Sequence, residues 1–127
     1  MYEYHGWLSL RESPSEIDGG KLGQSIVRIE QLIAEFPDKS AVVGLKRING
    51  MYSLWITGHS NHKSDCTLKL FKQIATEAPR TYGVLFIWDD EDLSGLSNAF
   101  QVWKLARGNA VQVADTLLSP CVPTIED

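Results

Sequence analysis

The sequence predicts an α+β domain, in which an antiparallel sheet carries two helices on one face. Three observations lead to this class. Several short stretches alternate between apolar and polar residues, two longer stretches repeat apolar residues every three or four positions, and Gly or Pro separates most of them. The chain has 127 residues, 43% hydrophobic and 22% charged, which suits one globular domain with its own core; we place this domain over residues 1–127.

The first predicted strand spans residues 2–10. Its even positions are mostly aromatic or aliphatic and its odd positions mostly polar, as expected for a half-buried strand. A loop rich in Ser, Pro, Asp and Gly follows. A helix is then predicted over residues 22–36, where Ile26, Ile29 and Ile33 form an apolar stripe. The helix ends at Pro37.

A hairpin and a second helix come next. Residues 41–48 and 51–59 are predicted strands, and the Asn49-Gly50 pair between them favours a tight type I′ turn. The second helix begins near Asp65, presents an apolar face and ends at Pro79. After Pro79 ends this helix, the chain is expected to form another strand of the sheet.

The last elements complete the predicted order. Residues 82–88 are almost continuously apolar, which is typical of a strand buried on both faces. Residues 100–106 and 110–115 form a second hairpin that turns at Gly108-Asn109, and the proline-containing tail, residues 119–123, is expected to be extended. The first six elements follow the β-α-β-β-α-β order of the split βαβ, or ferredoxin-like, sandwich. The C-terminal hairpin and tail are additions to it.

All four tryptophans lie in predicted strands. Trp7 and Trp55 share the alternation phase of the polar residues, so they belong to the less hydrophobic face of the sheet. In the predicted sandwich this face has no helix over it. Two alternatives follow: the indoles are exposed as binding anchors, or the final hairpin folds over the face and buries them in a second small core.

The charge of the chain is unevenly distributed. The net charge is −4; residues 1–83 carry nine acidic and ten basic side chains, whereas residues 84–127 carry seven acidic and two basic ones. Nucleic acid requires a basic surface, so direct nucleic-acid binding is not expected, and a basic protein partner is plausible on charge grounds. The acidic run at residues 89–92 lacks the calcium-loop pattern. It is either a solvated loop or a docking point for a basic protein.

Neither a metal ion nor another cofactor is expected. His59 and His62 offer two imidazoles, but further ligands at recognisable spacing are missing. The alternative is a small metal-dependent enzyme in which His5, His59, His62 and the acidic run assemble around a metal. A second alternative rests on the βαββαβ order shared with RNA-recognition domains, although their basic and aromatic consensus is absent.

The expected compartment is the cytoplasm. The longest apolar run, Val84–Trp88, is much shorter than the roughly 20 residues of a membrane-spanning helix. The first residues lack the basic and apolar regions of a secretory signal. In the cytoplasm Cys66 and Cys121 should stay reduced. We therefore expect no contact with a membrane.

Three blocks of the sequence together resemble a known family. The blocks are His5-Gly6-Trp7; the segment from Trp88 to Gly108, which contains the acidic run and the sequence FQVW; and the tail LSPCVPTIED at residues 118–127. They resemble the immunity protein 7 family of bacterial polymorphic toxin systems. The tail is the most specific of the three.

The resemblance implies a function without catalysis. It implies a cytoplasmic antitoxin, active in contact-dependent growth inhibition between bacteria, that binds and neutralises the C-terminal toxin domain of a secreted effector. Many such toxins are basic nucleases, and an acidic inhibitor can mimic the phosphates that a nuclease binds. We expect a monomeric inhibitor in a 1:1 complex.

The predicted toxin-facing surface combines two acidic segments. The members of the set are Glu12, Glu16 and Asp18 in the first loop, and Asp89, Asp90, Glu91 and Asp92 after the apolar strand. The prediction assumes that the strands before these two segments are parallel neighbours. Under that assumption both segments emerge at the same edge of the sheet.

Overall fold

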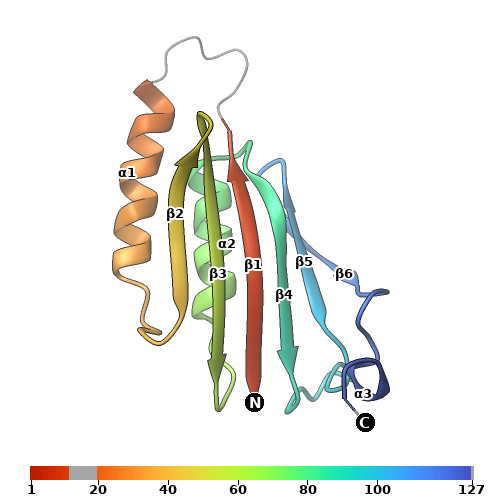
Figure 1. Ribbon diagram of the computed structural model, residues 1–127. Helices are drawn as coiled ribbons and strands as arrows, with labels where there is room; N and C mark the ends of the chain where they lie inside the picture. The colour runs from red at the N-terminus through yellow and green to blue at the C-terminus, as the bar shows by residue number, and fades with distance from the viewer. Residues whose placement is uncertain (12–19, 127) are drawn as a thin grey trace.

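The computed structural model describes residues 1–11 and 20–126 and has the predicted α+β architecture (Figure 1). Its elements are β1 (Tyr2–Leu10), α1 (Gly20–Ala34), β2 (Val42–Ile48), β3 (Met51–Ser60), α2 (Cys66–Glu77), β4 (Tyr82–Asp89), β5 (Gln101–Ala106), β6 (Asn109–Ala114) and α3 (Cys121–Thr124). The six strands form one antiparallel sheet in the order β2-β3-β1-β4-β5-β6. None of the described helices is long and apolar enough to cross a membrane.

Both hairpins turn at a pair of residues with positive φ. Asn49 and Gly50 have φ of 49° and 81°, which confirms the predicted turn. In the second hairpin the pair is Arg107-Gly108, with φ of 53° and 79°, one residue earlier than predicted. The glycine occupies the second turn position in both hairpins, and Asn109 is therefore free to pair with Ala106 in the ladder.

The main core lies between the helices and one face of the sheet. Tyr4 and Leu8 of β1, Ile29 of α1 and Phe71 of α2 are all buried in it. In Figure 1 α2 lies behind the strands, and none of the described helices or strands stands in front of β3, β1 and β4. The prediction that both helices cover one face is confirmed.

The final hairpin extends the sheet and does not fold over it. β5 pairs with β4, and β6 pairs with β5, so the hairpin continues the sheet beyond β4. The side chains of Trp7 and Trp55 remain 48% and 40% exposed. The alternative in which the hairpin buries these indoles is therefore wrong, because the edge of β4 offers the hairpin backbone hydrogen bonds that the sheet face cannot offer.

The tail is not simply extended, because side chains from elsewhere fold it into a short turn. The amide N–H of Cys121 donates to the Asn98 carbonyl (2.8 Å), and the Asn98 side chain accepts from the Val122 N–H (2.8 Å) and donates to the Val122 carbonyl (3.1 Å). Cys121 is fully buried against Trp88 and Phe100 in a second, smaller core. The prolines exclude a long helix, but not this packed turn.

β1 and β4 are antiparallel neighbours, contrary to the assumption behind the predicted surface. Tyr2 pairs with Asp89, and Ser9 pairs with Tyr82. The acidic run therefore lies beside the start of β1, and the loop after Leu10 begins at the opposite end of the sheet. The assumption was wrong because α2 returns the chain so that β4 runs in the same direction as β3, which is itself antiparallel to β1.

Candidate functional site

The helix-free face of the sheet carries several exposed apolar side chains. Its centre is the cross-strand pair of Trp7 on β1 and Trp55 on β3, which lie directly opposite each other. The strand registers place further exposed apolar side chains on the same face: Val42, Ile48, Met51, Tyr82, Val111 and Val113. A contiguous exposed apolar surface on a folded domain commonly marks an interaction site.

Both indoles are held in place by their neighbours. Trp7 packs edge to face with Tyr82 at a centroid distance of 6.1 Å, and the Arg11 guanidinium lies 5.1 Å from the Tyr82 ring. The Trp55 ring lies over Gly44 of β2, where a Cβ atom would come within 2.0 Å of it. Because neighbouring groups limit their rotation, these aromatic side chains lose little entropy on binding a partner.

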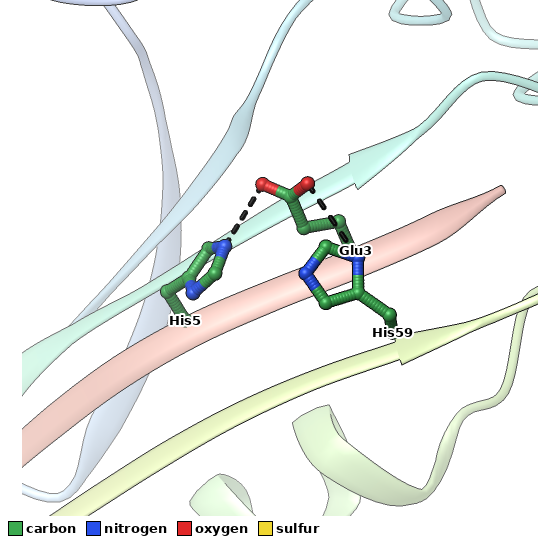
Figure 2. Close-up of side chains that lie close together, drawn as sticks. All are labelled: Glu3, His5 and His59. Atoms are coloured by element: carbon green, nitrogen blue, oxygen red, sulfur yellow. Dashed lines mark hydrogen bonds and ion pairs between the residues drawn. The ribbon is translucent and has the colours of Figure 1, made fainter. Parts of the chain in front are cut away.

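A cluster of Glu3, His5 and His59 lies on the same face (Figure 2). His5 Nε2 is 2.8 Å from Glu3 Oε2, and His59 Nδ1 is 3.7 Å from Glu3 Oε1. His5 Nδ1 is 3.2 Å from Thr57 Oγ1. The two imidazole rings meet edge to face at 5.9 Å. The cluster thus places one imidazole on each side of the Glu3 carboxylate.

The strand register creates this cluster. Glu3 and His5 are two residues apart on β1 and so share a face, while His59 and Thr57 of β3 lie directly opposite them. The sequence pointed to His5 and His59 as candidate ligands but not to Glu3. The polar phase of residues 2–10 contains Glu3, but only the pairing of β1 with β3 brings it beside His59.

His62 and the acidic run do not join this cluster. His62 Nδ1 lies 2.8 Å from Glu91 Oε1 instead. Among the described residues, the group whose ligand atoms converge closely enough for a metal ion is Glu3, His5 and His59. The enzyme alternative required His5, His59, His62 and the acidic run in one site, and the structure does not bring them together.

The acidic run is a folded loop whose carboxylates all have partners within the chain. Asp89 is buried and accepts from the Glu91 N–H (3.1 Å), and Asp90 pairs with the Met1 ammonium (2.7 Å). The Asp92 carboxylate accepts from the Ser94 hydroxyl (2.6 Å), and this hydrogen bond is the main cause of its lowered pKa.

The same loop still presents negative charge to solvent. The side chains of Asp90 and Glu91 are about half exposed. The hydrogen bond from His62 lowers the pKa of Glu91, which keeps this carboxyl ionised. Leu93, the next residue after the run, is fully exposed. Internal pairing therefore accounts for the shape of the loop and leaves the Asp90 and Glu91 carboxylates about half exposed at this end of the sheet.

The other predicted site residues are Glu12, Glu16 and Asp18, which lie outside the described residues. The strand before them, β1, ends beside Tyr82, which begins β4. Asp89, at the other end of β4, pairs with Tyr2 at the start of β1. The acidic run and the point where the first loop begins are thus at opposite ends of the sheet.

A sheet that leaves one face uncovered and exposes two braced indoles on it has the features of a protein-binding domain. The chain belongs to the immunity protein 7 family, since the model of that family, described as Immunity protein 7, matches residues 1–127. It is therefore an immunity protein, an antitoxin of a toxin system, and its family points to an inhibitor rather than an enzyme. Neither the search of curated proteins nor that of solved structures returned a match.

The blocks that carried the family resemblance contain both surface and fold residues. In the first block, His5 belongs to the exposed cluster, Gly6 lies beneath the Phe71 ring, and Trp7 stands on the helix-free face. In the tail, Ser119 accepts a hydrogen bond from the Phe100 N–H (2.9 Å), and Cys121 fills the smaller core. The tail residues therefore have a packing role. The first block combines one packed residue, Gly6, with the exposed residues His5 and Trp7.

Proposed function

We propose that this immunity protein neutralises its cognate toxin domain by binding it through the helix-free face, with Trp7 and Trp55 as anchors. The observation that carries the proposal is the in-register pair of braced, half-exposed indoles on an uncovered face. Large aromatic side chains contribute most of the energy in many protein interfaces. Membership of an immunity family supports a toxin as the occupant of this face.

The acidic run belongs to the same proposed surface. Asp89 is level with Tyr2 and Trp7 is five residues further along β1, which corresponds to roughly 17 Å at about 3.3 Å per residue. An ordinary interface buries about 800 Å² on each partner, a patch roughly 30 Å across. One toxin domain can therefore contact both the indoles and the residues Asp90 and Glu91.

The charge of this end supports a basic partner. Exposed carboxylates increase the rate of encounter with a basic surface, and a nuclease needs such a surface to bind phosphates. We therefore propose a basic nuclease toxin, neutralised in the cytoplasm as a 1:1 complex during contact-dependent competition. Glu12, Glu16 and Asp18 remain a prediction from the sequence, and the acidic part of the proposed surface consists of Asp90 and Glu91.

Growth rescue tests this function. Cells that express the cognate toxin domain should grow when this chain is co-expressed, and should die when an unrelated immunity protein replaces it. The Trp7→Ala/Trp55→Ala double variant should lose rescue, whereas Val27→Ala, which truncates an exposed side chain on α1, should keep it. Death despite soluble wild-type protein would contradict the function. Full rescue by the double variant would contradict the proposed surface alone.

A further inference from the structure

We propose that Glu3, His5 and His59 form a binding site for a divalent transition-metal ion such as Zn²⁺. The metal alternative considered from the sequence placed His5 and His59 with His62 and the acidic run, and it did not include Glu3. The sheet brings together two imidazoles and one carboxylate, a donor set that suits Zn²⁺, Ni²⁺ or Cu²⁺ better than Mg²⁺ or Ca²⁺, which prefer oxygen ligands alone.

The distances fit such an ion after small side-chain rotations. One ligand atom from each of the three residues lies within 4.8 Å of the others. Bonds of about 2.0–2.1 Å in tetrahedral geometry require donor atoms about 3.3 Å apart. His5 Nε2 is 2.8 Å from Glu3 Oε2 and His59 Nδ1 is 3.7 Å from Glu3 Oε1, so each imidazole lies near one of the two carboxylate oxygens at a separation close to this value. The backbone need not move, because the register of β1 and β3 fixes the three positions.

Thr57 supports the tautomer of His5 that a metal requires. Its hydroxyl lies 3.2 Å from Nδ1 of His5, so it can accept a hydrogen bond from a protonated Nδ1. At 2.8 Å, Nε2 donates its proton to Glu3 Oε2, and an ion that takes the position between them displaces this proton and leaves the Nε2 lone pair to bind it. A hydrogen bond on the second ring nitrogen is a regular feature of metal-bound histidines.

The site is open to solvent from the helix-free face. The side-chain exposures of Glu3, His5 and His59 are 20%, 41% and 59%. Figure 2 shows the Glu3 carboxylate pointing toward both imidazole rings. An ion can therefore enter without any opening of the fold. Three protein ligands leave at least one coordination position for water, and the inference does not depend on the toxin.

The test is metal binding by the purified full-length chain. We expect saturable Zn²⁺ binding at one ion per chain by calorimetry, and a visible absorption band on titration with Co²⁺. His59→Ala should weaken Zn²⁺ binding at least about tenfold and abolish the Co²⁺ band, because it removes one of three ligands. The matched control is His62→Ala, which removes a nearby exposed histidine that pairs with Glu91 outside the cluster.

Two further measurements keep the result interpretable. His59 is mostly exposed, so His59→Ala should unfold at the wild-type temperature in the absence of metal. Zn²⁺ should raise the unfolding temperature of the wild type and of His62→Ala, but not that of His59→Ala or Glu3→Gln. The inference is overturned if the wild type shows no saturable binding, or if His62→Ala loses binding as much as His59→Ala.

Discussion

At the scale of single residues, strand glycines, which have no side chain, leave room for aromatic rings to lie directly on the backbone of the sheet. A Cβ atom at Gly6 would come within 2.7 Å of Cζ of Phe71 and within 3.0 Å of the Val84 carbonyl oxygen. On the helix face, the Tyr4 ring covers Gly58 in the same way, with 2.2 Å to a Cβ atom placed there. The glycine of the His5-Gly6-Trp7 block therefore has a packing role, while its two neighbours in the block point to the other face.

Gly6→Ala should destabilise the fold. The added methyl group must displace the Phe71 ring or the backbone of β4, and such overpacking costs about 1–3 kcal/mol. Urea unfolding measures the change. The control is Gly23→Ala on α1, where nothing lies within 4 Å of a new Cβ atom and the helix should gain up to about 1 kcal/mol. An unchanged midpoint for Gly6→Ala would contradict the packing described here.

Tyr4→Phe should destabilise the protein in a pH-dependent way. Hydrogen bonds from the Ser40 hydroxyl and then from the Tyr4 hydroxyl hold the pKa of Asp38 below its usual value. A lowered folded-state pKa contributes stability above the unfolded value of about 3.9, and this contribution is lost as the pH falls through the folded value.

Removal of the Tyr4 hydroxyl should therefore reduce the unfolding free energy by about 1 kcal/mol at pH 7. The difference from wild type should be smaller at pH 3 than at pH 7, because the stability that an ionised Asp38 contributes is lost as its carboxyl is protonated. Urea unfolding at the two pH values gives the comparison. A cost that is larger at pH 3 than at pH 7 would contradict the assignment of this hydrogen bond.

At the scale of elements, the tail is held by contacts with the loop before β5 and with the residue after β6. The Asn98 side chain makes two hydrogen bonds to Val122, and Asp115 accepts from the Ser119 hydroxyl (2.7 Å). These contacts enclose Cys121, which has no exposed surface. Burial, with a smaller contribution from Asp115, raises the pKa of the Cys121 thiol and keeps it protonated.

Asn98→Ala should release the tail. In the wild type, iodoacetamide should label the partly exposed Cys66 and leave Cys121 unlabelled until the protein unfolds. The variant should lose about 1–3 kcal/mol of stability and label Cys121 faster, as followed by mass spectrometry. The exposed Asn61 provides the control, since Asn61→Ala should leave the labelling unchanged. Equal labelling of both cysteines in the wild type would contradict the buried position of Cys121.

The elements were predictable from the sequence where local pattern determines them. Alternation assigned the two faces of β1 correctly, and the Asn49-Gly50 pair located the first hairpin. Pairings between distant segments were not predictable in this way. The sequence does not encode locally that Glu3 lies opposite His59, that β4 runs against β1, or that Asn98 folds the tail. The candidate site was therefore found only in part.

At the scale of the whole molecule, the acidic run should control how fast a toxin associates. The double variant Asp90→Asn/Glu91→Gln removes two half-exposed charges and keeps the shapes of the side chains. We expect slower association at low ionic strength and a weaker dependence of the rate on salt, measured by stopped flow. Glu30→Gln/Glu35→Gln, which changes exposed carboxylates on the helix side, is the control. Equal association rates would remove Asp90 and Glu91 from the proposed surface.

The affinity for the cognate toxin domain tests the central claim most directly, because that claim is that the uncovered sheet face binds the toxin through its two indoles. Calorimetry should show that Trp7→Ala and Trp55→Ala each weaken binding about 30-fold or more, equivalent to about 2 kcal/mol. Val27→Ala on α1 should bind as the wild type does. Affinities of both tryptophan variants within about threefold of wild type, at unchanged stability, would contradict the account.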